Sequence, residues 1–176
     1  MPVENVKQTA SPAGRAALLG ILAALALALS ILEGLLPAIP IPGAKLGLSN
    51  IVTMYALTSL GFPAALAITV VKAVFAMLRG GAAAIMSLCG GLLSTLVMWL
   101  ALRLIGRRVS FIGIGVLGAV AHNAGQLLAA MVLLSPAIAA YGPWLLVMAL
   151  VAGILTGLTL NMVMPGLSVL TKSMRL

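Results

Sequence analysis

Four ionisable side chains inside or beside apolar segments are the first candidates for chemistry. Lys72 lies within an apolar run, Arg79 follows it by seven residues, and Lys45 and Glu33 lie nearer the N-terminus. A charged group at membrane depth costs about 2.5–3.5 kcal/mol, so it usually faces a partner or a water-filled cavity. The spacing puts Lys72 and Arg79 on one helical face. Two interpretations remain open: a positively charged binding site with Glu33 as counter-ion, or ion pairs and snorkelling side chains at the membrane interface.

A second polar group lies in a later apolar run, where His122, Asn123 and Gln126 fall within five residues. His122 and Gln126 are one helical turn apart and face the same way. Near the centre of a bilayer such groups need hydrogen-bond partners, which favours either an interhelical contact or a ligand cavity. At the start of a short apolar segment, Asn50, Ser49 and Thr53 are expected to line the same space.

The composition of the chain requires a lipid environment. Hydrophobic residues make up 63% of the sequence and charged residues only 7%, against about 25% charged residues in soluble domains. Mean hydropathy is +1.27, and the alternating pattern of a β-barrel is not visible. The sequence therefore predicts an all-α integral membrane protein. Its lone cysteine, Cys89, is expected to be buried and inert.

About six apolar runs approach the length of about 20 residues that crosses a bilayer. They cover residues 14–36, 49–60, 63–78, 83–104, 112–134 and 143–164. The Pro/Gly-rich stretch after the first run predicts an irregular outer loop, because proline interrupts a helix. Ser49 or Asn50 is expected to cap the short second segment.

We expect a single six-helix membrane domain over residues 14–165. Residues 1–13 form a polar N-terminal tail, and residues 166–176 form a C-terminal tail because Pro165 and Gly166 should stop the last helix. Six crossings place both termini on the same side of the membrane. The basic residues on that side are Lys7, Arg15, Arg103, Arg107, Arg108, Lys172 and Arg175. The positive-inside rule makes that side the cytoplasm.

The charge balance also limits the kinds of partner and reaction. A net charge of +8 would suggest nucleic acid in a soluble protein, but here the positive residues end apolar runs and would attract anionic lipid headgroups. No nucleic-acid partner is expected. The chain has no phosphate-binding loop, and one His with one Cys cannot form a zinc site. Two scattered carboxylates, Glu4 and Glu33, cannot hold the Mg²⁺ that prenyl-diphosphate chemistry needs. We therefore expect no enzyme activity, metal or cofactor.

Three short motifs resemble those of a known bacterial membrane family. They are PGAKLGLSNIV at residues 42–52, LCGGLLS at residues 88–94 and GAVAHNAGQ at residues 118–126. The family has two names, heptaprenyl diphosphate synthase component I and the Gx transporter family. The resemblance implies a multi-pass protein of the bacterial cytoplasmic membrane. Lys72 stands where we expect Arg in much of the family, which keeps the charge but loses the bidentate fork.

The family is similar in size and layout to the substrate-binding S components of energy-coupling factor transporters. That likeness implies a protein that captures a small compound from outside and works with a membrane coupling subunit and ATPases. It also implies that the small residues Gly20, Ala24 and Ala28, spaced four apart, form the face that docks on the coupling subunit.

These observations together predict a substrate-capture subunit for a small polar or anionic compound. The expected substrate contacts are Glu33, Lys45, Asn50, Lys72, Arg79, His122, Asn123 and Gln126. The alternative is a non-catalytic accessory subunit in isoprenoid, quinone or flavin-linked electron-transfer metabolism, since some members of the family are associated with such gene clusters.

Overall fold

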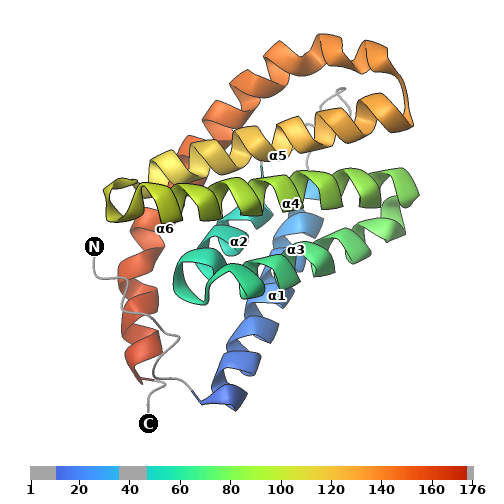
Figure 1. Cartoon of the computed structure of the whole chain (residues 1–176). Coiled ribbons are helices and arrows are strands. Elements are labelled where there is room, and N and C mark those ends of the chain that lie inside the picture. The colour runs from blue at the N-terminus through green and yellow to red at the C-terminus, as the bar shows by residue number, and fades with distance from the viewer. Residues whose placement is uncertain (1–10, 36–46, 174–176) are drawn as a thin grey trace.

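The computed structural model describes residues 11–35 and 47–173, and the regular structure in these ranges is helical (Figure 1). The α-helices are α1 (Pro12–Leu35), α2 (Leu48–Ser59), α3 (Phe62–Ala76), α4 (Gly81–Leu104), α5 (Phe111–Leu133) and α6 (Gly142–Ser173). Short 3₁₀ turns connect several of them: η2 (Met77–Arg79), η3 (Gly106–Arg108) and η4 (Pro136–Tyr141). The predicted all-α fold is confirmed.

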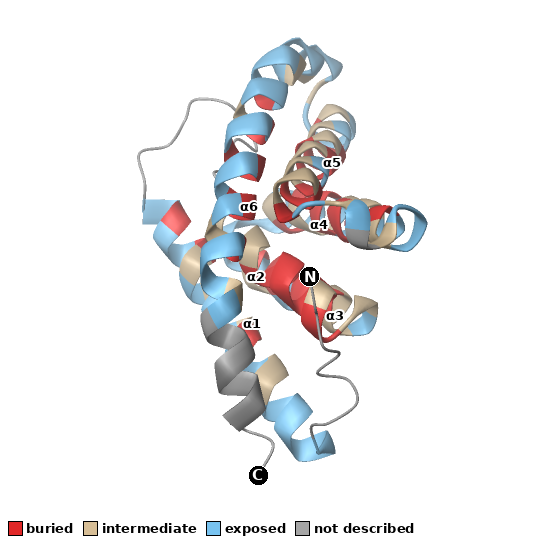
Figure 2. Ribbon diagram, turned by 90° about the vertical axis from the view of Figure 1, so that its left-hand side faces the viewer, coloured by how far each residue is buried: buried red, intermediate tan, exposed pale blue. Residues whose placement is uncertain are grey.

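Five helical stretches in the described part of the chain are long and apolar enough to cross a membrane. They are Pro12–Leu35, Phe62–Arg79, Gly81–Leu104, Phe111–Leu133 and Pro136–Pro165. Large apolar side chains such as Leu78 and Val132, 80% and 87% exposed, cover the outer surface, and the exposed faces lie along the outside of the bundle (Figure 2). Such a surface is stable only in lipid.

Helix α2 is the exception, because its 12 residues rise only about 18 Å, well short of the roughly 30 Å of hydrocarbon. It lies in the middle of the bundle and contacts α1, α3, α4, α5 and α6. Val52, Met54, Ala56 and Leu57 are all buried. The sequence predicted a short second segment, and the structure shows that this segment forms the core.

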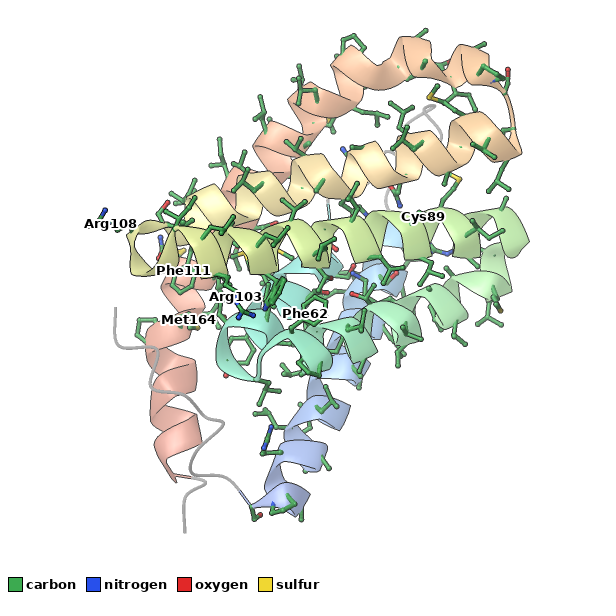
Figure 3. All side chains as sticks on the ribbon, in the orientation of Figure 1. Phe62, Cys89, Arg103, Arg108, Phe111 and Met164 are labelled. Atoms are coloured by element: carbon green, nitrogen blue, oxygen red, sulfur yellow. The ribbon has the colours of Figure 1, made fainter. Side chains whose placement is uncertain are left out.

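The remaining helices pack in sequence around this core. Helix α5 lies between α4 and α6, while α3 packs against α4 and also against α1. Where α4 ends, the guanidinium of Arg103 lies 5.2 Å from the centre of the Trp99 ring. That ring is 5.2 Å from the ring of Phe62 at the start of α3. Arg103 lies beside Phe62, and exposed Arg108 lies at the same end of α4 (Figure 3). Aromatic and basic residues of this kind are typical of a membrane interface.

Glycine residues allow α5 and α6 to approach to backbone contact. A Cβ atom on Gly157 would lie 2.4 Å from Ile112 Cα, and one on Gly115 would lie 2.4 Å from Gly153 O. Gly153 and Gly157 are four residues apart, which is the small-xxx-small spacing that permits close helix packing in membranes.

Three expectations about local structure were wrong. Helix α6 does not stop at Pro165 but continues through it to Ser173. Proline is tolerated inside membrane helices because neighbouring groups satisfy the freed backbone atoms. Neither Ser49 nor Asn50 caps α2: the N-cap residue is Gly47, which has φ +73° and no side chain to offer. Cys89 is exposed on α4 (Figure 3). The predicted Pro-rich loop falls outside the described residues.

Gly157→Ala should destabilise the protein by about 1–3 kcal/mol, because the new methyl group would meet the α5 backbone and push α5 from α6. Gly20→Ala is the matched control, since a Cβ there has nothing within 4 Å. Thermal unfolding in detergent measures both variants. Equal melting temperatures for the two variants would contradict the close α5–α6 contact.

Candidate functional site

A small polar cavity lies between α1, α2, α3, α4 and α5. Its lining residues are Ser30, Glu33, Gly47, Ser49, Asn50, Lys72, Ser87, His122 and Gln126. Its volume is about 20 Å³, which is room for about one water molecule. Apart from Gly47, each described residue of the lining carries a polar or charged side chain. A space of this kind inside an apolar bundle is a candidate binding site.

Glu33 connects the end of α1 to the start of α2. The backbone N–H of Gly47 donates a hydrogen bond to Glu33 Oε1. Gly47 also closes the first turn, because its carbonyl accepts from the N–H of Asn50 at 2.8 Å. The first N–H groups of a helix lack partners within it, and the positive end of the helix dipole favours a negative charge there. Glu33, only 9% exposed, thus caps α2 from a different helix.

Lys72 approaches the same cavity from α3. Its side chain is 9% exposed, and Nζ donates to Asn50 Oδ1 at 2.9 Å. One turn earlier, the hydroxyl groups of Thr69 and Thr95 lie 3.1 Å apart and form a hydrogen bond between α3 and α4. This bond fixes how α3 lies on α4 and thereby turns Lys72 inward. An ammonium group and a carboxylate therefore face one buried polar space.

Helix α5 contributes His122 and Gln126, as their spacing predicted. Both are buried, and Gln126 is 4% exposed. A Cβ on Gly90 of α4 would lie 2.6 Å from Gln126 Cγ and 2.7 Å from His122 O, so glycine is needed to let these residues fit against α4. Gln126 Oε1 is buried and has no hydrogen-bond partner among the described residues. A buried acceptor without a partner in a native protein is typically satisfied by water or a ligand.

A second cavity, of about 10 Å³, adjoins the first and extends between α4, α5 and α6. The two share Gly47, Asn50 and His122. Asn123 lines only the second cavity, where its Nδ2 donates to Leu145 O at 2.9 Å. Asn123 therefore ties α5 to α6 at the edge of the site.

Five of the eight predicted contact residues meet at the polar cavity: Glu33, Asn50, Lys72, His122 and Gln126. Arg79 is exposed in η2 and lines neither cavity. Lys45 lies outside the described residues. The predicted docking residues Gly20, Ala24 and Ala28 are all exposed on α1.

The prediction missed Ser30 and Ser87, which also line the polar cavity. Ser30 lies one turn before Glu33, and Ser87 one turn before Gly90. This spacing puts Ser30 on the same helical face as Glu33, and Ser87 on the same face as Gly90. It was the only signal in the sequence that could have predicted the two serines as site residues. Serine is common in membrane helices, so neither residue stood out. Within residues 11–35 and 47–173, no three His, Cys, Asp or Glu side chains gather into a possible metal site.

The fold and the cavity define a class of protein: an all-α membrane protein in which long helices enclose a half-length helix and a buried polar site. The model of the family described as heptaprenyl diphosphate synthase component I matches residues 22–163. The chain belongs to this family, and the match includes all the described residues that line the polar cavity. No curated protein and no solved structure matches the chain.

Asn50→Leu should lower stability by about 1.5–3 kcal/mol, because it removes an acceptor from the buried ammonium of Lys72. Thr58→Val on the same helix is the control, since Thr58 bonds only to carbonyls of its own helix, those of Met54 and Tyr55. Thermal unfolding compares the two variants. A control as damaging as Asn50→Leu would argue against the Lys72–Asn50 contact.

Proposed function

We propose that the protein is a substrate-capture subunit that binds a small polar or anionic compound and serves its uptake, as S components of energy-coupling factor transporters do. The observation that carries this proposal is the small polar cavity, at which five helices present a carboxylate, an ammonium group and amide side chains. Groups of this kind are expensive inside a membrane and are usually retained for binding or transport.

The half-length helix α2 supports the same proposal. Gly47, its N-cap, lines both cavities, so α2 begins inside the bundle. In many membrane transporters, short helices that begin inside the membrane direct their free N–H groups toward a substrate. Here Glu33 occupies that position, and the cavity beside it is closed to water-molecule size. We take this as the closed form of a binding site.

Energy for uptake would come from partner subunits, because the sequence has no nucleotide-binding loop. In this proposal a membrane coupling subunit docks on α1, where Gly20, Ala24 and Ala28 are exposed and would permit close helix approach. Arg15 at the start of α1 and Pro63 at the start of α3 line one pocket, so by α3 the chain has returned to its starting side although α2 alone is too short to span. In this proposal the positive-inside rule makes that side the cytoplasm of a bacterial cell, with both termini there and the substrate on the other side.

A second candidate function rests on the printed description of the family. In this alternative the chain is a non-catalytic membrane component of prenyl-diphosphate synthesis or of quinone- or flavin-linked electron transfer. The sequence is consistent with a non-catalytic part, because two carboxylates in the whole chain are too few to cluster around Mg²⁺ on a diphosphate.

Ligand-dependent thermal stabilisation tests substrate capture. A screen of vitamins, flavins, amino acids and prenyl diphosphates should yield a compound that stabilises the purified protein by about 2.7 kcal/mol at a hundred times its dissociation constant. His122→Ala and Gln126→Leu should each weaken that binding by about tenfold, because each removes a polar group from the cavity. Arg79→Ala, at an exposed position outside the cavity, is the matched control and should bind normally.

Binding that is lost in Arg79→Ala and kept in the two cavity variants would contradict the assigned site. Co-purification distinguishes the two functions. Substrate capture predicts a complex with ATPase and coupling subunits, whereas the alternative predicts a complex with a soluble prenyl-transferring or redox subunit.

A further inference from the structure

The formal charges of the described residues that line the polar cavity cancel. Among the described residues that line it, Glu33 is the only carboxylate and Lys72 the only ammonium group, so their sum is zero. A net charge in a low-dielectric interior is strongly unfavourable, whereas compensated charges are tolerated when they are hydrogen-bonded. A ligand that carries a net charge would upset this balance, and a ligand with equal and opposite charges would preserve it.

The cavity also offers both hydrogen-bond acceptors and donors. Its acceptors include the Glu33 carboxylate, and Gln126, which lines the cavity, has a buried Oε1 that lacks a partner among the described residues. Its donors include the Lys72 ammonium and the Gly47 N–H at the start of α2, which bond to Asn50 and to Glu33 in this structure. An alkylammonium offers three N–H donors and no acceptor, while a carboxylate only accepts. One set of groups therefore suits an ammonium, and the other suits a carboxylate.

We propose that the cavity binds a small zwitterion with a primary ammonium group, a compound of the amino-acid class. This inference rests on the proposed function and narrows its substrate. The ligand's ammonium group pairs with Glu33 and Gln126, and its carboxylate pairs with Lys72 and the N-terminus of α2. A simple anion would meet the two acceptors without a donor to offer them, and a simple amine would be repelled by Lys72.

The size of the cavity requires it to widen when a ligand enters. Its volume of about 20 Å³ and the adjoining 10 Å³ hold water molecules, but not a zwitterion of six or more heavy atoms. Asn50 and His122 line both cavities, so movement of these two side chains joins them into one larger space. The ligand is therefore compact, and Lys72 exchanges Asn50 for the ligand's carboxylate.

Matched compounds that differ only in charge test the proposal. Propionate is alanine without its ammonium group, and ethylamine is alanine without its carboxylate. Butyrate and propylamine are related to γ-aminobutyrate in the same way, and a wider set of amino acids completes the panel. Melting temperatures of the purified protein are measured with each compound. At least one zwitterion should stabilise the wild-type protein, and its carboxylate-only and amine-only counterparts should bind at least tenfold more weakly.

Charge-changing variants then test the assigned roles. Glu33→Gln leaves Lys72 uncompensated, so it should weaken zwitterion binding about tenfold or more and make the carboxylate-only compound the better ligand. Lys72→Gln should do the reverse and favour the amine. Glu33→Asp and Lys72→Arg keep the charges and should keep the zwitterion preference. Size-exclusion profiles identify any variant that does not fold, and either neutral variant alone is enough to test the change in preference.

The outcomes separate this inference from the proposed function. If only anions, cations or uncharged compounds stabilise the wild-type protein, the proposal of substrate capture is kept and the proposal of a zwitterionic ligand is overturned. If folded Glu33→Gln or Lys72→Gln binds the zwitterion, the carboxylate-only compound and the amine-only compound more weakly by the same factor, the charge-balance argument is overturned. If nothing stabilises the protein in either this panel or the broader ligand screen, both proposals fail.

Discussion

The contact between α4 and α5 at Gly90 and Gly125 positions most of the candidate site. A Cβ on Gly125 would lie 2.7 Å from Cys89 O and 2.9 Å from Gly90 Cα, so the two helices touch through their backbones. In lipid, helices associate through close packing rather than through the hydrophobic effect, and small residues at the interface make that packing possible. Because Gly90 also lies against Gln126 and His122, the contact that joins the helices turns these two residues toward α1, α2 and α3.

Helix α2 adds a requirement that the long helices do not have. A helix that begins inside the bundle exposes backbone N–H groups where water is scarce, and such groups must find partners. Glu33, near the end of α1, supplies one such partner, because its carboxylate accepts a hydrogen bond from the Gly47 N–H. Its negative charge needs compensation, and Lys72 faces the same cavity. The half-length helix thus accounts for both ionised groups. Glu33 accepts a hydrogen bond from the backbone at the start of α2, and Lys72 compensates the negative charge of Glu33.

The sequence was informative where a residue conflicted with its surroundings. Lys72, His122 and Gln126 are polar residues in apolar runs, and helical spacing alone correctly predicted that His122 and Gln126 face one space. The same argument did not bring Arg79 to the cavity beside Lys72. Helix α3 ends at Ala76 and continues as a 3₁₀ turn, Met77–Arg79. That turn has about 3.0 residues per turn instead of 3.6, so the seven-residue spacing no longer preserves the face.

Other features depend on tertiary contacts that spacing cannot reveal. The bond between Glu33 and Gly47 crosses from one helix to another, so local capping patterns pointed instead to Ser49 or Asn50. Ser30 and Ser87 become site residues only because α1 and α4 converge on α5. Hydropathy predicted the six-segment layout, but it could not predict that α2 forms the core. The length of α2, 12 residues, indicates only that this helix alone cannot span the membrane.

In the proposed function, Glu33 links ligand binding to the partner-facing side of the protein. Glu33 lies near the end of α1, and exposed Gly20, Ala24 and Ala28 lie on the same helix. In the closed form the carboxylate is engaged by Gly47, which holds α1 to α2. A ligand whose ammonium group pairs with Glu33 competes for that carboxylate and weakens the α1–α2 tie. Since a helix moves largely as a rigid rod, the same exchange shifts the small-residue face. Ligand occupancy and partner affinity are then thermodynamically coupled, and each must alter the other by the same factor.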